Sequence, residues 1–377
     1  MQEEVSKVRE WITGKKPGPL TIELLFGEGC NQNCKFCSNY NGKEGPLGRL
    51  NIKKGLSDSE YLRIIDECAS LGVWKIQLSG EGEPLFDKKL AIPLMKKIKE
   101  KGMYGFLNTN GVLFNEKDIK ELVELGWDKI LFSIESPKAG THDYLVSVKG
   151  SFDKAMHNTE RFNYWRKKLG KEAPEMEFKM VLTNRNYNQI EDMVLLADKM
   201  NVHLRIDCLI VFHEYGKALS LNDSQKKEFG QNLKKALELH RKLVEKRGKS
   251  NELRFDISDE LYNEVFSKTD AHFSRKKENK LAIFQFLKKK QNKFISSSCY
   301  FPWLRILINT QGFAGPCGFA YTKDNVKNKS LKEIWYGKEY EKIREDRMNQ
   351  ILGEYCPLCG DIQANVKIRQ KLKEVVK

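Results

Sequence analysis

Residues 20–37 read LTIELLFGEGCNQNCKFC, an apolar run that leads into a short loop with several cysteines. This stretch predicts a β-strand over 20–26, since its apolar residues recur at every second position and not with a helical period. Gly27 and Gly29 allow the loop backbone to wrap closely around a bound group. The loop carries three thiols, at Cys30, Cys34 and Cys37. The first part of the chain is therefore expected to be a strand that delivers three cysteines at its carboxyl end.

The same alternation of apolar runs and helical stretches continues to about residue 211. It is typical of repeated βα units around a parallel sheet, and it predicts an α/β fold with strands near 20–26, 74–79, 104–109, 129–135, 177–182 and 203–210. Ser57 and Glu60 form a capping box ahead of the first long helix, and Gly72 ends it. Cys68 falls on the buried stripe of that helix, where we expect an ordinary core thiol.

The predicted strands alternate between apolar and polar residues, whereas parallel strands covered on both faces are usually apolar throughout. One face is apolar and comprises Ile22, Leu24, Phe26, Trp74, Ile76, Leu78, Ile130, Phe132, Ile134, Phe178, Met180, Leu182, Leu204, Ile206 and Cys208. The other face is polar and comprises Thr21, Glu23, Gln77, Ser79, Asn108, Ser133, Glu135, Glu177, Lys179, Arg205 and Asp207. We expect helices to cover the apolar face and the polar face to line a chamber inside a curved sheet. An antiparallel sheet with one wet face is the alternative, and the intervening helices argue against it.

The composition limits the class of protein. The chain has 377 residues, 40% of them hydrophobic, which suits two or three domains with a sizeable core. Its formal net charge of +15 suits an acidic partner, which could be a phosphorylated or carboxylated substrate, a nucleic acid or an acidic protein. No signal peptide or membrane span is predicted, so we expect a cytoplasmic protein with reduced thiols. Nine cysteines in that setting indicate metal binding.

Much of the positive charge is local. Residues 211–298 hold 20 basic and 12 acidic residues, which supply +8 of the +15. The residues Arg241, Lys242, Lys246, Arg247 and Lys249 predict a solvated helix face, and Lys288, Lys289 and Lys290 close an amphipathic run that starts at Leu281. A nucleic-acid surface is disfavoured, because no aromatic ladder accompanies the charge.

The composition and motifs together predict five segments. They are an N-terminal arm (1–19), a barrel (20–212), a basic helical insert or linker (213–298), a cysteine-containing auxiliary domain (299–362) and a C-terminal helix (363–377).

Seven of the nine cysteines form a group of three and a group of four, while Cys68 and Cys208 stand alone. Cys30, Cys34 and Cys37 can bind three irons of a [4Fe-4S] cube and leave the fourth iron open to a substrate. Zinc is the alternative, but it prefers four closed ligands and needs a distant histidine here. The spacing favours the iron-sulfur cluster.

The wider context of the three cysteines resembles the radical S-adenosylmethionine (SAM) superfamily. Phe36 directly precedes the third cysteine, and the sequence from Gly80 to Pro84 (GEGEP) resembles the family's GGEP motif after the second strand. Thr109-Asn110-Gly111 and Ser133-Ile134-Glu135 fit the strand ends that face SAM in the family. The resemblance covers about residues 20–211 and implies a partial (β/α)6 barrel like that of TIM.

The resemblance implies both a chemistry and a set of contacts. The reduced cluster cleaves SAM to a 5′-deoxyadenosyl radical, which abstracts hydrogen from the substrate inside a site that excludes water. The residues implied in SAM binding are Phe36, Gly82, Glu83, Asn110 and Ser133. Val146 stands where relatives often place an arginine that reaches the SAM carboxylate. We expect Lys149, Lys179 or Arg205 to replace that contact.

The downstream cysteines resemble the start of a SPASM auxiliary-cluster domain. They are Cys299, Cys317, Cys356 and Cys359, and Pro302-Trp303 precede a predicted strand. Residues 362–377 contain no further cysteine, so the resemblance implies one four-thiolate [4Fe-4S] cluster, as in the shortened "twitch" form. A zinc site with four thiolates makes the same demands and is the alternative.

The family resemblance leaves the substrate open. Only about 19 residues precede the barrel, one auxiliary cluster is available and the chamber is polar. We therefore expect a small polar or anionic substrate, such as a sugar or an aminocyclitol, that is oxidised or epimerised. The alternative is a maturase that modifies a ribosomally made peptide or protein, with the 213–298 insert holding the precursor. A non-catalytic iron-sulfur electron carrier is the third possibility, and it has no need of the SAM motifs.

The expected substrate-handling and catalytic residues lie on the polar strand face, and they are Glu135, Lys179, Arg205 and Asp207. Cys208 is expected to pack in the core rather than to donate a hydrogen atom. The resemblance also implies a flavodoxin- or ferredoxin-type reductant as partner.

Overall fold

The computed structural model describes residues 2–27, 29–49, 55–248, 253–257, 297–353, 356 and 362–375. Its central element is a nine-stranded sheet in the order β11-β10-β1-β4-β5-β6-β7-β8-β9. The strands are β1 (Thr21–Leu25), β4 (Lys75–Ser79), β5 (Tyr104–Thr109), β6 (Lys129–Ser133), β7 (Glu175–Val181), β8 (His203–Asp207), β9 (Phe255–Ile257), β10 (Arg305–Ile308) and β11 (Ala314–Gly315). All neighbouring pairs are parallel except β10 and β11. The six strands expected from the sequence are therefore confirmed, and they are consecutive in the sheet.

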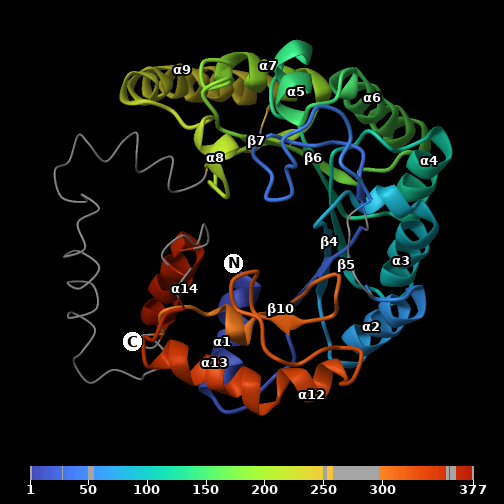
Figure 1. Cartoon of the computed structure of the whole chain (residues 1–377), viewed down its shortest axis with the longest axis vertical. Helices are drawn as coiled ribbons and strands as arrows, with labels where there is room; N and C mark the ends of the chain where they lie inside the picture. Colours follow the sequence, from blue (N-terminus) through green and yellow to red (C-terminus); the bar gives the residue numbers. More distant parts are fainter. Residues whose placement is uncertain are drawn as a thin grey trace.

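Helices connect the strands and follow the outer side of the curved sheet, where Figure 1 shows α2, α3, α4, α6, α7 and α9 as an arc. The helices are α1 (Gln2–Ile12), α2 (Asp58–Ser70), α3 (Lys88–Glu100), α4 (Glu116–Leu125), α5 (Ala139–Val146), α6 (Ser151–Leu169), α7 (Ile190–Met200), α8 (Glu214–Lys217), α9 (Asp223–Arg247), α12 (Leu331–Trp335), α13 (Lys338–Met348) and α14 (Ile362–Val375). The expected capping box is present, since Ser57 caps α2 and Glu60 bonds back to the cap. Within the described ranges, no helix is both long and apolar enough to cross a membrane.

The core lies between the sheet and this outer layer of helices. Side chains of the predicted apolar face are fully buried there, for example Ile22, Ile76 and Phe178. Trp74 is an exception to the predicted face. It directly precedes β4, is 45% exposed and stacks on Tyr104.

The auxiliary segment is continuous with the barrel sheet, which the sequence analysis did not anticipate. Strand β10 pairs in parallel with β1, with Thr21 opposite Arg305 and Leu24 opposite Ile308. This pairing satisfies the backbone groups of β1 that would otherwise form an open edge. The two cysteine-bearing regions are therefore held by one sheet.

The N-terminal helix and the C-terminal region pack together at one end of the molecule (Figure 1). Arg344 on α13 is 1% exposed, and its guanidinium donates to the carbonyl oxygens of Pro302 (2.9 Å) and Trp335 (2.8 Å). The same group lies 4.5 Å from the ring centroid of Trp11 on α1. Arg344 thus joins α1, α12 and the turn before β10.

The described part of the basic insert differs in two respects from the expectation. Residues 255–257 form β9, which extends the sheet beside β8. Arg247 does not belong to a solvated face, because its Nε donates to Asp198 at 2.5 Å and its Nη1 to Asn201 at 3.0 Å, which fastens α9 to α7. Arg241 is exposed as expected and pairs with Glu238 and Glu245. Lys249 and the run from Leu281 to Lys290 lie outside the described residues.

Candidate functional site

The loop after β1 brings the first three cysteines into one small region. Cys30 belongs to a short strand, β2 (Gly29–Cys30), which pairs with β3 (Gly48–Arg49). The amide of Cys37 donates to the carbonyl of Cys34 at 2.9 Å, so these two cysteines share one turn. The loop is fastened from outside as well, because Asn33 donates its amide to Val146 at the end of α5. The segment from Cys30 to Cys37, which we call the thiol loop, is therefore folded and held in place by its neighbours.

The pKa shifts of the thiols show that the three cysteines lie within electrostatic range of one another. Burial raises the pKa of Cys34 well above its ordinary value, and the neighbouring Cys37 and Cys30 thiols and the Glu135 carboxylate raise it further. Burial also raises the pKa of Cys30 to about 12, with Glu83 as the second cause. A buried thiol of this kind gives up its proton when a bound metal cation compensates the charge of the thiolate. The iron of a cluster supplies such a charge, so the donor set fits an iron-sulfur cluster.

The predicted SAM motif packs directly on the thiol loop. A side chain on Gly82 would meet the carbonyl oxygen of Gly29 at 2.3 Å, so only glycine fits at position 82. Glu83 donates its amide to the same carbonyl at 2.8 Å. Its carboxylate accepts from the Thr109 hydroxyl (2.6 Å) and from the amides of Asn110 (2.8 Å) and Leu85 (3.1 Å). Glu83 is 3% exposed, and these donors hold its carboxylate at the ends of β4 and β5.

The remaining predicted SAM contacts lie in the thiol loop and at the carboxyl ends of β5 and β6. Asn110 is buried, and its side chain donates to Asn31 in the thiol loop at 2.8 Å. Ser133 ends β6, and Phe36 is partly buried in the thiol loop. Val146 is 1% exposed. An apolar and almost fully buried side chain at that position gives SAM no charged contact, whereas Lys149 is exposed and Lys179 and Arg205 lie on the sheet.

The structure brings the four predicted substrate-handling residues together on β7, β8 and the end of β6. Ser133, Lys179 and Arg205 are opposite one another on adjacent strands. Asp207 accepts from Arg205 Nε at 2.7 Å and lies 3.4 Å from Lys179 Nζ. Burial raises the pKa of Glu135 to about 7, while the Val181 amide and Lys179 lower it and Asp207 raises it. Because Glu135 also acts on Cys34, this group extends up to the thiol loop.

A second polar group lies on β1, on β4 and just after β10. The sequence predicts only part of this group. Glu23 on β1 accepts from Ser79 Oγ at 2.8 Å and Gln77 Nε2 at 3.2 Å, as its polar face predicts. Glu81 binds the hydroxyl of Thr310, which lies just after β10. This contact joins the GEGEP motif to the auxiliary segment. Thr310 could not be found by its sequence neighbours, since its partner is 229 residues away.

The described auxiliary cysteines lie close to this polar group. Burial raises the pKa of Cys317, Arg305 lowers it and Cys356 raises it, so Cys317 and Cys356 are within electrostatic range. Burial raises the pKa of Tyr321 well above its usual range, and Glu81, Glu23 and Cys317 raise it further. Tyr321 is therefore within electrostatic range of two carboxylates of the barrel and of one auxiliary cysteine. Cys299 is partly buried, and Cys359 lies outside the described residues.

Within the described part of the chain, no three His, Cys, Asp or Glu side chains converge on one metal ion. A cube spreads its ligands over separate irons and does not need such convergence. The lack of a single-ion site among the described residues therefore does not argue against the cluster expected from the spacing.

His213 is a functional candidate that the sequence analysis missed. Its Nε2 lies 2.8 Å from the carbonyl oxygen of Cys37, and its ring packs near Tyr40 and Tyr215. A single histidine at the start of a four-residue helix carries no sequence signal for this contact.

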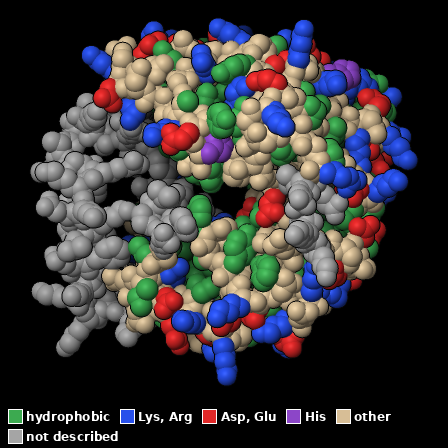
Figure 2. All heavy atoms as spheres, viewed as in Figure 1, with side chains coloured by type: hydrophobic (Ala, Val, Ile, Leu, Met, Phe, Trp, Pro, Cys, Tyr) green, Lys and Arg blue, Asp and Glu red, His purple; other side chains and the backbone are tan. Residues whose placement is uncertain are grey.

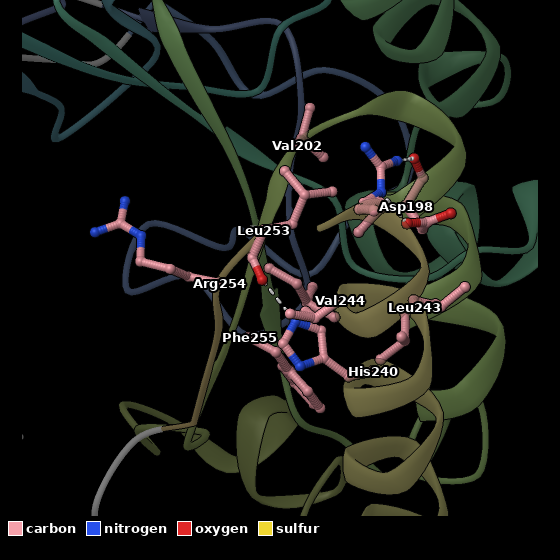
Figure 3. A pocket seen from close by; sticks show the side chains of 12 residues that line it. Asp198, Val202, His240, Leu243, Val244, Leu253, Arg254 and Phe255 are labelled. Carbon is pink, nitrogen blue, oxygen red and sulfur yellow. Dashed lines mark hydrogen bonds and ion pairs between the residues drawn. The ribbon is translucent and has the colours of Figure 1, made fainter. Parts of the chain in front are cut away.

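A separate pocket lies between α7, α9, β8 and β9 (Figure 3). Its lining is mostly apolar, and His240 bonds the carbonyl of Leu253 at 2.6 Å while Arg254 extends away from it. None of the predicted site residues lines this pocket. We interpret it as a gap in the packing of α9 against the sheet and α7.

Comparison with protein families agrees with this geometry. Residues 24–197 match the radical SAM superfamily, and residues 299–360 match an iron-sulfur cluster-binding domain, SPASM. The radical SAM domain implies SAM and a [4Fe-4S] cluster, and the SPASM domain implies auxiliary iron-sulfur clusters.

Known relatives differ in how much of the chain they match. A GTP 3′,8-cyclase of Clostridium perfringens is 28% identical over 57% of this chain, and the match spans 63% of that relative. A PqqA peptide cyclase of Rhizobium meliloti is 23% identical over 90% of this chain and 79% of its own length. The structure of SuiB from Streptococcus suis bound to its precursor peptide SuiA has the same fold, with a TM-score of 0.62 and 18% identity, covering 91% of this chain and 71% of SuiB. The chain belongs to the radical SAM superfamily of enzymes and carries a SPASM domain over residues 299–360.

Proposed function

We propose that this enzyme modifies a ribosomally made peptide or protein. The observation that carries the proposal is the length of the match to the PqqA peptide cyclase, which includes both the barrel and the auxiliary domain. The match to the GTP cyclase covers only 57% of the chain. The fold shared with the peptide-bound SuiB supports the same proposal. The peptide alternative is thus favoured over the small polar substrate that was the main expectation.

The surface beside the thiol loop also suits a peptide. Ile210, Val211, Phe212 and Tyr215 are 42%, 47%, 53% and 59% exposed, respectively, and we call them the apolar rim. His213, within this segment, contacts Cys37. Figure 2 shows hydrophobic side chains on both sides of the central opening in this face of the molecule. Exposed apolar side chains next to a reactive site can bind the apolar residues of a peptide, whereas a sugar offers them little.

The basic run of the insert is a weaker candidate for peptide binding. Arg241 pairs with Glu238 and Glu245, Lys242 lies 3.5 Å from Glu238, and Arg247 binds Asp198. These cations already have anionic partners. We therefore place the peptide at the apolar rim and not at the 241–249 run.

The residues of the chamber have separate proposed roles. When bound, the reduced cluster and SAM supply the 5′-deoxyadenosyl radical that removes a hydrogen atom from the substrate. Glu83, Asn110 and Ser133 hold SAM, and the row formed by Lys179, Arg205 and Asp207 orients the substrate backbone through charged hydrogen bonds. Glu135 is the proposed proton acceptor, because its burial keeps its proton affinity high.

The proposal is tested with reduced enzyme, SAM and two substrate panels. One panel contains perdeuterated short peptides encoded beside the gene, and the other contains deuterated sugars and aminocyclitols. We expect deuterium in 5′-deoxyadenosine, and a mass change, only with a peptide. Deuterium transfer from a sugar alone would contradict the proposal.

Two variants sharpen this test. Phe212→Ser should raise the peptide KM about tenfold, roughly 1.4 kcal/mol, and leave uncoupled SAM cleavage unchanged. Leu195→Ser is the matched control, because Leu195 is 48% exposed and lies on α7, in the helical layer on the outer side of the sheet. A small anionic substrate would not use the apolar rim, so Phe212→Ser would leave its KM unchanged while Arg205→Ala raised that KM by about ten- to a hundredfold.

A further inference from the structure

Gln32 lies between the first two cysteines of the thiol loop and is 2% exposed. Its backbone amide donates to Cys30 Sγ at 3.4 Å, and its carbonyl accepts from the Leu47 amide at 3.1 Å. The backbone of Gln32 is therefore fixed on both sides. Its position is set by the fold and not by its own side chain.

The side chain of Gln32 is satisfied at only one end. Its Oε1 accepts from the Cys34 thiol at 3.7 Å. Its Nε2 is buried and has no hydrogen-bond partner among the described residues. An unpaired buried N–H group is costly, so a native protein normally supplies a partner for it in some functional state.

The missing partner follows from the chemistry of cysteine ligation. A cysteine that binds iron is a thiolate, which accepts hydrogen bonds and donates none. Gln32 Oε1 would then face an anionic sulfur. The terminal torsion of glutamine is broad and roughly two-fold, so a half turn replaces Oε1 by Nε2 with almost no change of shape.

We propose that Gln32 is a positioning residue of the SAM-binding cluster, which donates its backbone amide to the Cys30 sulfur and its side-chain amide to the Cys34 sulfur when the cluster is bound. The inference rests on the assignment of Cys30, Cys34 and Cys37 as cluster ligands. It does not depend on whether the substrate is a peptide.

Two hydrogen bonds to the ligand sulfurs change the reduction potential. The reduced cluster carries one more negative charge, and donors to sulfur stabilise that charge more than they stabilise the oxidised form. Gln32 should therefore make the cluster easier to reduce. A role in packing alone would leave the potential unchanged.

The test is a redox titration of reconstituted full-length enzyme, followed by the electron paramagnetic resonance signal that changes on addition of SAM. Gln32→Met keeps the length of the side chain and removes its donors. We expect its reduction equilibrium constant to fall about tenfold, which is 59 mV for one electron. Gln32→Glu should lower it further, because a carboxylate beside the sulfur repels the added electron.

Asn33→Ser is the matched control. Asn33 is also 2% exposed, but its side chain donates to Asn41 Oδ1 (2.6 Å) and the Lys43 carbonyl (2.8 Å). We expect this variant to loosen the loop without moving the potential. An equal shift in Asn33→Ser and Gln32→Met would overturn the inference.

A second measurement uses the unmodified enzyme, in case Gln32→Met does not retain its cluster. Protein labelled with ¹⁵Nε-glutamine should show a nitrogen hyperfine coupling to the reduced SAM-binding cluster, and Gln32→Asn in the same labelled background should lose it. If the labelled unmodified enzyme held its full iron content and still showed no such coupling, the inference would be overturned. Full iron retention after joint replacement of the three cysteines would overturn the ligand assignment itself, which is a different failure.

Discussion

His213 Nε2 lies 2.8 Å from the carbonyl oxygen of Cys37, so the segment that follows the last barrel strand holds the turn of the thiol loop. The contact is supported by ring packing of His213 with Tyr40 (5.9 Å) and Tyr215 (5.9 Å). The hydrogen bond joins the predicted insert (213–298) to the predicted barrel (20–212). The start of the insert is therefore part of the thiol-loop environment.

Replacement of His213 tests this contact. His213→Ala removes a hydrogen bond worth about 1 kcal/mol and the packing of two rings, so the loop should open more often. We expect the SAM-binding cluster to be lost several times faster when an iron chelator is added, as measured by the decay of its visible absorption. His157→Ala, at an exposed histidine of α6, is the control and should decay like the unmodified enzyme. Equal decay of both variants would contradict the role of His213.

Iron content tests the two cysteine groups. Anaerobically reconstituted enzyme should hold about eight irons as two cubes, one with three and one with four thiolate ligands. Joint replacement of Cys30, Cys34 and Cys37 by Ala should leave about four. Bound zinc together with only about four irons in the unmodified enzyme would remove the auxiliary-cluster assignment and leave the first assignment standing.

Variants at Glu83 and Thr109 distinguish a role in SAM binding from a role in local folding. Glu83→Ala leaves three donors without an acceptor and removes the carboxylate, so SAM binding should weaken at least about tenfold, roughly 1.4 kcal/mol or more. Thr109→Val removes only one of these donors and should weaken SAM binding less. Calorimetric titration of each reconstituted variant with SAM gives the affinities. Unchanged affinity in Glu83→Ala would show that this carboxylate supports the loop only.

The sequence predicts the parts of this site that depend on short spacing. The six strands, the thiol loop and the polar face with Glu135 and Lys179 follow from residues a few positions apart, because strand parity decides which side chains share a face. Trp74, which directly precedes β4 and is 45% exposed, departs from the parity because it lies outside the strand.

The remaining contacts could not be predicted, because they join distant segments. Thr310 meets Glu81 across 229 residues, and His213 meets Cys37 across 176. The pairing of β10 with β1 creates the first of these contacts, and no local pattern signals which edge of a sheet a late strand will join. The missed residues are thus those whose partners are set by topology.

His142 should make stability depend on pH. It is fully buried, its Nδ1 accepts from the Glu135 amide at 3.1 Å, and burial lowers its pKa to about 4, partly offset by Asp143. The unfolded chain, with an ordinary histidine pKa of about 6.5, binds this proton first as the pH falls. The stabilisation is therefore complete above about pH 6.5 and is lost as the pH falls towards 4.

The expected size of this effect is about 2 kcal/mol between pH 7 and pH 5. His142→Asn keeps an acceptor for the amide but cannot titrate, so the difference in unfolding free energy between the two pH values should shrink by that amount. Urea unfolding of both proteins side by side measures it. An identical pH dependence in the variant would show that His142 is not the titrating group.

Replacement of Cys208 tests whether a thiol of the barrel takes part in the reaction. It directly follows β8, is partly buried and packs against the main core together with residues of the helical layer. Strand parity places it with Leu204 and Ile206, away from the face of Lys179 and Asp207. We therefore expect this thiol to remain in the core and to take no part in the reaction. Cys208→Ala should therefore keep SAM cleavage and product formation while lowering the unfolding free energy by about 1 kcal/mol. Intact SAM cleavage with loss of the product's inverted stereocentre would identify Cys208 as a hydrogen-atom donor and place its side chain in the chamber.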